Sequence, residues 1–194
     1  MPITTKNSLG WHIADNPELY EPARTNTFEF VVTDIDKLLR AGVDDTGDNG
    51  DEDYVTGGQE TIRLAVNKAD VPHFSQGEID ISRGNIKSYY AGAMTFDAGS
   101  IEVIDYIGSS GKSVLMAWQR LSGDAKTGQV GRAKDYKKTC TLIEYTPDYE
   151  KIRSWTLVGC WVTKLSETAF SMDSADKKVI TATIRYDRAY PEEF

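Results

Sequence analysis

The sequence predicts a mainly β fold, an antiparallel β-barrel or sandwich that carries one main α-helix. Three stretches in the last third of the chain, 136–145, 154–163 and 178–187, are rich in Thr, Val, Ile, Tyr and Trp, which favour strands. One segment, at about 110–121, has an apolar face with clear helical spacing. Strands and helices do not alternate regularly, which argues against a parallel sheet built from βαβ units.

Length and composition indicate a folded, acidic protein of one domain. The 194 residues are 40% apolar, which is enough for a sizeable core. Thirty acidic residues against 22 basic ones give a net charge of -8, and a surface of this sign repels phosphate and disfavours tight nucleic-acid binding. No apolar run is long enough for a membrane helix, and the first residues lack the apolar centre of a signal peptide. We therefore expect a soluble protein made in a cytoplasm.

The first element of the fold is expected at residue 27. Residues 1–26 are polar and rich in turn-forming residues, which indicates an N-terminal arm. A strand is predicted at 27–33, and its alternating apolar side chains share one face: Phe28, Phe30 and Val32.

An acidic loop follows a short predicted helix. The helix, 34–41, would be capped by Asp34 and ended by Gly42. The loop is predicted at 42–60, and most of the chain's negative charge lies in it and in the helix before it. Its carboxylates between 44 and 53 are Asp44, Asp45, Asp48, Asp51, Glu52 and Asp53.

The middle of the chain is expected to add three strands. Residues 61–66 alternate apolar and polar side chains, which would place Ile62, Leu64 and Val66 on one face. A strand at 78–82 would turn Ile79 and Ile81 inward, and a third strand is predicted at 100–107. The Gly- and aromatic-rich segment 83–99 between them indicates either an irregular connection or a looped-out hairpin.

The predicted helix at about 110–121 and the last strand supply most of the expected core. In the helix, Val114, Leu115, Trp118 and Leu121 fall on one face, and a long loop, 122–135, follows. In the last strand, Ile180, Ala182, Ile184 and Tyr186 share a face. The side chains that we expect in the core are Phe28, Phe30, Trp118, Leu121, Trp155, Trp161 and Ile184. Cys140 and Cys160 lie in predicted strands, and we interpret them as buried free thiols rather than a disulfide.

A phosphate-binding loop is the most tempting motif, and it fails at one position. Residues 108–113 read Gly-Ser-Ser-Gly-Lys-Ser and stand between a predicted strand and helix. The P-loop pattern requires a further glycine at position 106, where this chain has Tyr106. We therefore interpret the segment as a helix cap formed by Ser109 or Ser110.

Metal and catalytic motifs also lack support in the sequence. Neither Asp44 nor Asp45 starts a register that fits a calcium loop of the EF-hand type, so a solvated acidic loop is the preferred reading over weak cation binding. The two histidines, His12 and His73, have no second histidine or cysteine near them in sequence. We predict no enzyme activity, no cofactor and no metal.

Loops and arms outside the core hold several aromatic side chains. These are Trp11, Tyr20, Tyr54, Tyr89, Tyr90 and Tyr190. Aromatic residues are enriched at protein–protein interfaces, so these positions indicate assembly, although they could also simply cover the barrel.

Four segments together resemble the tail tube proteins of contractile-tailed (myovirus-type) bacteriophages. They are Asn16-Pro-Glu-Leu-Tyr-Glu-Pro-Ala-Arg-Thr-Asn-Thr-Phe-Glu-Phe30, Ile81-Ser-Arg-Gly-Asn-Ile-Lys-Ser-Tyr-Tyr-Ala-Gly92, Trp155-Thr-Leu-Val-Gly-Cys-Trp161 and Ile180-Thr-Ala-Thr-Ile-Arg-Tyr-Asp187. The resemblance implies a single β-barrel tube domain, 27–194, after the arm, 1–26. It also implies homohexameric rings that stack into a tube and share a continuous β-barrel around a channel.

The resemblance further implies a place in the virion tail and a set of partners. The tube would be assembled in the host cytoplasm, would surround a tape-measure protein, and would contact a contractile sheath, a baseplate hub and a tail terminator. Genomic DNA would pass through it without specific binding. The candidate subunit and ring-to-ring interface consists of Tyr20, Arg24, Asp44, Asp45, Asp48, Asp51, Glu52, Asp53, Tyr54, Asn85, Tyr89, Tyr90 and Tyr190.

Several alternatives remain open at the level of the sequence. The acidic loop could line the channel, or lie between rings near Lys134, Lys137 and Lys138, and we favour the second position. The same tube could belong to a phage-derived injection particle or a secretion needle. A monomeric carbohydrate- or protein-binding β-domain is an alternative of another class, and an enzyme using the acidic loop and a metal is a third.

Overall fold

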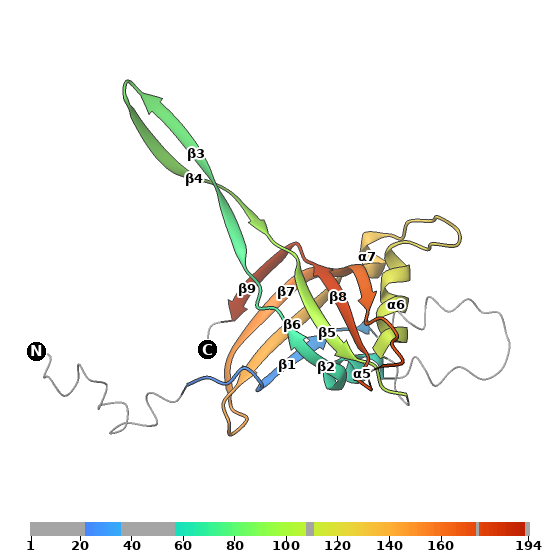
Figure 1. Ribbon diagram of the computed structural model, residues 1–194. Coiled ribbons are helices and arrows are strands. Elements are labelled where there is room, and N and C mark those ends of the chain that lie inside the picture. Colours follow the sequence, from blue (N-terminus) through green and yellow to red (C-terminus); the bar gives the residue numbers. More distant parts are fainter. Residues whose placement is uncertain (1–21, 36–56, 108–110, 174, 193–194) are drawn as a thin grey trace, which may run out of the picture.

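A seven-stranded antiparallel sheet forms the body of the protein (Figure 1). The computed structural model describes residues 22–35, 57–107, 111–173 and 175–192. Six strands follow the order β1-β6-β7-β8-β5-β2, and β9 pairs with β7.

The strands are β1 (Phe28–Val32), β2 (Val66–Ala69), β3 (Phe74–Arg83), β4 (Ile86–Phe96), β5 (Gly99–Ile104), β6 (Lys138–Tyr145), β7 (Lys151–Glu167), β8 (Val179–Arg185) and β9 (Arg188–Glu192). The helices are α5 (Gly58–Ala65), α6 (Gly111–Ser122) and α7 (Ala133–Tyr136). The predicted mainly β class is confirmed.

Helix α6 packs against the sheet and supplies the centre of the core. Val114, Leu115 and Trp118 are buried on its inner face, as the helical spacing predicts. The Trp118 indole Nε1 donates a hydrogen bond of 2.8 Å to the carbonyl oxygen of Tyr136, so this large side chain is buried without an unpaired donor. The predicted helix is confirmed, and Leu121 packs at the edge of the same core.

Strands β1 and β8 bury alternate side chains on the same core. Phe30 and Val32 are buried in β1, and Phe28 packs partly buried beside them. In β8 and the residue after it, the buried set is the predicted one: Ile180, Ala182, Ile184 and Tyr186. Trp155 on β7 is partly buried against this core. Cys140 and Cys160 are both free and buried, as predicted, and burial raises the pKa of the Cys140 thiol.

A strand was predicted at 61–66, and this prediction is wrong for 61–65, which belong to a helix; Val66 begins β2. Helix α5 covers 58–65 and begins after Gly57, whose carbonyl oxygen accepts a hydrogen bond of 2.8 Å from the Thr61 N–H. Ile62 and Ala65, one helical turn apart, are buried, whereas Leu64 is 67% exposed. The helix also takes residues 58–60 from the predicted loop 42–60, and α7 occupies 133–135 of the predicted loop 122–135.

Trp161 was expected in the core, and this prediction is wrong. Its neighbours Cys160 and Val162 are buried, so the side chain between them points to the opposite face of β7. There the Trp161 ring meets Tyr136 edge-on, with ring centroids 5.7 Å apart.

A sharp corner joins β8 to β9. Strand β9 was not predicted from the sequence. β8 pairs with β7 from Trp161 to Glu167, and β9 pairs with the same strand from Ser154 to Val158. Gly159 lies between the two pairings with φ 74°, and a Cβ atom there would collide with the carboxylate of Asp187. The corner therefore needs glycine at this position.

Several predictions fall on residues outside the described ranges. They include most of the arm, the acidic loop between 44 and 53, and the helix at 34–41 beyond its first two residues. These stay predictions. Of the predicted helix, Asp34 has φ 61° and Ile35 is buried.

Candidate assembly surface

A long hairpin formed by β3 and β4 projects from the body (Figure 1). The two strands make a separate two-stranded sheet. Ile79 and Ile81 were expected to face inward, but they are 54% and 44% exposed. The reason is that this strand leaves the body, so neither of its faces meets the core. Of the two readings of segment 83–99, the looped-out hairpin is correct.

One face of the hairpin is apolar. Residues directly opposite in an antiparallel pair point to the same side, and Ile79 is opposite Tyr90 while Arg83 is opposite Ile86. Alternation along each strand adds Ile81 to this side. Ile86 is 72% and Tyr90 56% exposed. A two-stranded ribbon with an uncovered apolar face is a typical docking element.

The other face of the hairpin is polar. Asp80 is opposite Tyr89, and Ser82 is opposite Lys87. The Lys87 ammonium lies 3.0 Å from a carboxylate oxygen of Asp80. The hairpin is therefore amphipathic: the Asp80–Lys87 ion pair lies on one side, and the three isoleucines lie on the other, where Arg83 is at the end next to the turn.

The base of the hairpin is anchored to the body by aromatic side chains. Phe96 lies between Phe74 and Tyr186, with ring centroids 5.8 Å and 6.1 Å away. Above this anchor the strands cross closely, since a Cβ atom on Gly92 would lie 2.8 Å from the carbonyl oxygen of Gly77. The anchor gives the projecting hairpin a defined origin in the core.

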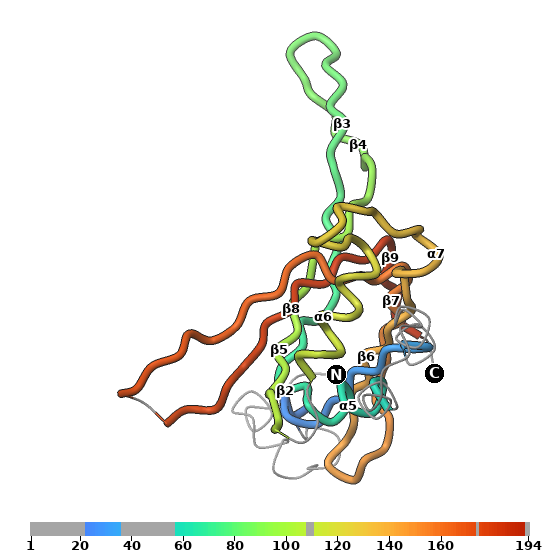
Figure 2. The backbone as a smooth tube through the Cα atoms, turned by 90° about the vertical axis from the view of Figure 1, so that its right-hand side faces the viewer, coloured from blue at the N-terminus to red at the C-terminus, as the bar shows by residue number. Residues whose placement is uncertain are grey.

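A second projection is formed by the outer ends of β7 and β8 (Figure 2). A carboxylate oxygen of Glu167 lies 2.7 Å from the Lys112 ammonium, and the other lies 3.1 Å from the Lys178 ammonium. The hydrogen bond from Lys112, and after it the one from Lys178, lowers the pKa of the Glu167 carboxyl. The contact with Lys112 also joins α6 to the base of the projection. Beyond the base, Phe170 and Met172 are 89% and 106% exposed. Figure 2 shows the two projections leaving the body in different directions.

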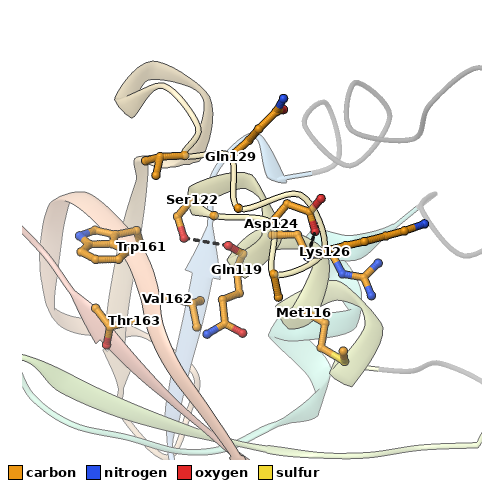
Figure 3. A pocket seen from close by; sticks show the side chains of 14 residues that line it. Met116, Gln119, Ser122, Asp124, Lys126, Gln129, Trp161, Val162 and Thr163 are labelled. Atoms are coloured by element: carbon orange, nitrogen blue, oxygen red, sulfur yellow. Dashed lines mark hydrogen bonds between the residues drawn. The ribbon is translucent and has the colours of Figure 1, made fainter.

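A cavity of about 540 Å³ lies beside the end of α6 (Figure 3). Its apolar lining comes from Met116, Val130, Trp161 and Val162. The charged side chains around it are Arg120, Asp124 and Lys126. The Asp124 carboxylate accepts hydrogen bonds from the Lys126 backbone N–H and the Thr127 hydroxyl, which lower its pKa.

The structure gathers some of the predicted interface residues and separates others. Asn85, Tyr89 and Tyr90 all lie on the hairpin, whereas Tyr190 is 49% exposed on β9 and Arg24 is exposed ahead of β1. The remaining predicted interface residues lie outside the described ranges. Sequence reasoning missed Ile86, Phe170 and Met172, although large apolar residues beside turn-forming ones were a usable signal.

The acidic loop between 44 and 53 and positions 108–110 of the P-loop-like segment, with the predicted cap at Ser109 or Ser110, lie outside the described residues and stay predictions. Lys112, the lysine of the P-loop-like segment, is engaged by Glu167. No group of three or more potential metal ligands gathers within the described residues. Among the helices described, none is long and apolar enough to cross a membrane.

Comparison with known families decides the class of protein. The family model for the T4-like virus tail tube protein gp19 matches residues 58–189, which is more than half of the chain. The chain belongs to this family. It is a tail tube protein, and the family named by the sequence resemblance is confirmed. No curated protein sequence matches the chain.

Solved structures share the fold of this tail tube protein at low sequence identity. A chain of the PVC sheath/tube terminator of an extracellular contractile injection system is 16% identical with a TM-score of 0.61, covering 90% of this chain and 99% of its own. A chain of the PVC sheath-tube complex is 18% identical with a TM-score of 0.59, and the coverage is 95% and 97%. The cap of the anti-feeding prophage is 16% identical with a TM-score of 0.57, and the coverage is 89% and 91%.

Proposed function

We propose that this tail tube protein forms homohexameric rings, which stack into a tube with a central channel. The observation that carries the proposal is the apolar face of the β3–β4 hairpin, made by Ile79, Ile81, Ile86 and Tyr90. An exposed apolar ribbon costs solubility unless a partner covers it. In a tube built of one subunit, the available partner is another copy of the chain.

The hairpin would carry several of the predicted interface residues into the contact. Asn85, Tyr89 and Tyr90 lie on it, and Tyr190 and Arg24 would serve other contacts of the body. The proposed interface also includes Tyr20, Tyr54 and the acidic residues between 44 and 53, which are assigned from the sequence because they lie outside the described residues. Pooling strands from several copies into one barrel would also protect exposed strand edges from unwanted pairing.

The partners follow from the role of a tube. The similar solved structures are a sheath/tube terminator, a sheath-tube complex and a tube-terminating cap. By analogy, a contractile sheath would enclose this tube, a terminator would end it and a baseplate hub would start it. A tape-measure protein would fill it during assembly in the host cytoplasm, and it would form part of the virion tail. We propose a structural role with no enzyme activity.

Genomic DNA is the proposed cargo, and it would pass through without specific binding. The net charge of -8 favours a wall that does not retain phosphate. A tube of the same design in a phage-derived injection particle is the second candidate, because the similar structures come from such particles. The nucleic-acid content of purified particles that contain this protein separates the two.

Electron microscopy and light scattering of the purified protein test the proposal. Rings or tubes of uniform diameter are the expected result. A protein that stays monomeric at high concentration, and also with its baseplate partner present to nucleate assembly, would overturn it.

A further inference from the structure

We propose that the β7–β8 tip of one copy docks into the cavity beside α6 of a second copy. The β7–β8 tip is defined here as residues 168–173 and 175–178. The contact is separate from the one made by the β3–β4 hairpin, because the two projections leave the body in different directions (Figure 2). The inference rests on the proposed function, since it describes one of the contacts that a ring requires.

The β7–β8 tip presents apolar side chains next to acidic ones. Phe170 and Met172 are almost fully exposed. Asp173 and Asp176 are also exposed, and no ion pair to either carboxylate occurs within the described residues. Of the two lysines of the tip, Lys177 donates a hydrogen bond of 3.3 Å to the Asn67 side chain. Lys178 pairs with Glu167, and its ammonium also lies 4.7 Å from the centroid of the Phe170 ring. The outer part of the tip, with Met172, Asp173 and Asp176, is therefore apolar and acidic.

The cavity beside α6 offers the complementary surface. Met116, Val130 and Trp161 supply apolar lining, and the cavity of about 540 Å³ has room for one or two large side chains (Figure 3). Among the described lining residues, the bases are Arg120 and Lys126, and the acid is Asp124, which already accepts two hydrogen bonds from its own loop. An occupant with apolar side chains flanked by carboxylates fits this site.

The tip cannot reach the cavity of its own chain. Trp161, Val162 and Thr163 line the cavity, and β7 then runs on to Glu167, about 13 Å further at the rise of a strand. Pairing with β8 continues to Glu167 opposite Ile180, and the Thr168 N–H still donates to the Val179 carbonyl oxygen. The ion pairs of Glu167 with Lys112 and Lys178 hold the base of this arm. A second copy of the chain is therefore the occupant.

The symmetry of this contact suits a ring. Donor and acceptor are different surfaces of one chain, so a contact repeated in one direction is head-to-tail and leaves a free tip at one end and a free cavity at the other. Head-to-tail contacts close into rings or continue as helices, whereas a reciprocal exchange of tips between two copies would stop at a dimer.

Site-directed cross-linking tests the contact. The double variant Met172→Cys/Val130→Cys places one thiol on the tip and one on the cavity loop, where Val130 is 83% exposed. Because Cys140 and Cys160 are buried, the wild-type protein and each single variant serve as low-background controls. A short bismaleimide added to assembled rings or tubes should produce a ladder of covalent oligomers from the double variant only.

The outcomes separate the inference from the proposed function. Rings or tubes that form normally and give no ladder would overturn the docking inference and leave the proposed function standing. A double variant and a wild-type protein that both fail to assemble would refute the proposed function, and the docking inference with it.

A charge exchange gives a second, independent test. Asp173→Lys/Asp176→Lys should raise the concentration needed for assembly roughly fivefold or more, because the reversed charges face Arg120 and Lys126. Adding Arg120→Glu/Lys126→Glu should restore most of the loss. Asp148→Lys/Glu150→Lys, at exposed positions in the turn between β6 and β7, is the matched control. If the control and the tip variant weaken assembly equally, or the exchange gives no rescue, the docking is wrong.

Discussion

The Lys137 ammonium lies 2.8 Å and 2.7 Å from the two carboxylate oxygens of Asp187, at the corner where β8 passes into β9. The same carboxylate stands against the backbone of Gly159, which has φ 74°. Three distant parts of the sequence meet here, and the corner allows β7 to pair with β8 along one half and with β9 along the other.

Gly159→Ala should destabilise the protein more than an equivalent change elsewhere. Both the left-handed backbone and the collision with Asp187 oppose a side chain at this position. The matched control is Gly128→Ala, with φ 71° and open space around it, which should cost about 1–2 kcal/mol in the free energy of unfolding. We expect Gly159→Ala to cost at least about 1 kcal/mol more in urea titrations. Equal losses in the two variants would show that the Asp187 contact does not constrain the corner.

The two tryptophans at 118 and 161 should respond differently to truncation. Trp118→Ala removes a fully buried side chain and its hydrogen bond to Tyr136, and should cost about 3–5 kcal/mol in the free energy of unfolding. Trp161→Ala removes a half-buried ring from the outer face of β7, and should cost about 1–2 kcal/mol. Thermal or urea unfolding measures both. The reverse order would mean that the core has been assigned to the wrong face of β7.

Protonation of the Glu192 carboxyl should lower the free energy of unfolding in acid. Hydrogen bonds from Ser154, Thr156 and Lys151 lower its pKa in the folded protein. A carboxyl with a lowered folded pKa contributes stability above its unfolded pKa, and this contribution is lost as the pH falls through the folded pKa. Urea unfolding at pH 7 and at several values below about pH 4.5 should therefore show a weaker acid dependence in Glu192→Gln than in the wild type.

The control for this pH series is Glu78→Gln on the exposed hairpin. It should follow the wild-type acid dependence closely. If Glu192→Gln also follows it, the hydroxyl groups of Ser154 and Thr156 do not anchor β9 through this carboxylate.

Removing the apolar face of the β3–β4 hairpin should impair assembly and spare the fold. Ile79→Ser/Ile81→Ser changes two exposed side chains, so the free energy of unfolding should change by less than about 1 kcal/mol. Sedimentation should nevertheless show fewer rings and tubes. Lys87→Ser on the polar face is the control and should assemble almost normally. Equal assembly of the two variants would count against the apolar face as an interface.

The regular parts of the fold could be predicted because each pattern matched the surface that it buries. Helix α6 has four apolar residues on one face. Strand β8 alternates between side chains that are buried in the core and side chains that are only partly buried, up to the exposed Arg185 at its end. Helix α5 could not be recognised in the same way. Its short run alternates at Ile62 and Leu64, but the residues that pack are Ile62 and Ala65, and a few residues do not separate the two periods.

The candidate site was predicted only in part, for a related reason. Tyr89 and Tyr90 were identified as aromatic residues outside the core, and Asn85 came from the segment that resembles the family; all three lie on an exposed projection. Ile79 and Ile81 were expected inside because their alternation matches a half-buried strand. A sequence pattern shows that a face is apolar, but it does not show whether the chain itself or another molecule covers that face. The β7–β8 tip was missed because Phe170 and Met172 stand alone among polar residues.

Hydrogen exchange of the β3–β4 hairpin, compared between monomer and assembled tube, tests the central claim most directly. In the monomer, this two-stranded ribbon should exchange its amides rapidly, because only its base is packed on the body. Burial against a second copy predicts strong protection of residues 78–91 in the tube, with little change in α6 near Trp118. Equally rapid exchange of the hairpin in both states would contradict the assignment of this surface to tube assembly.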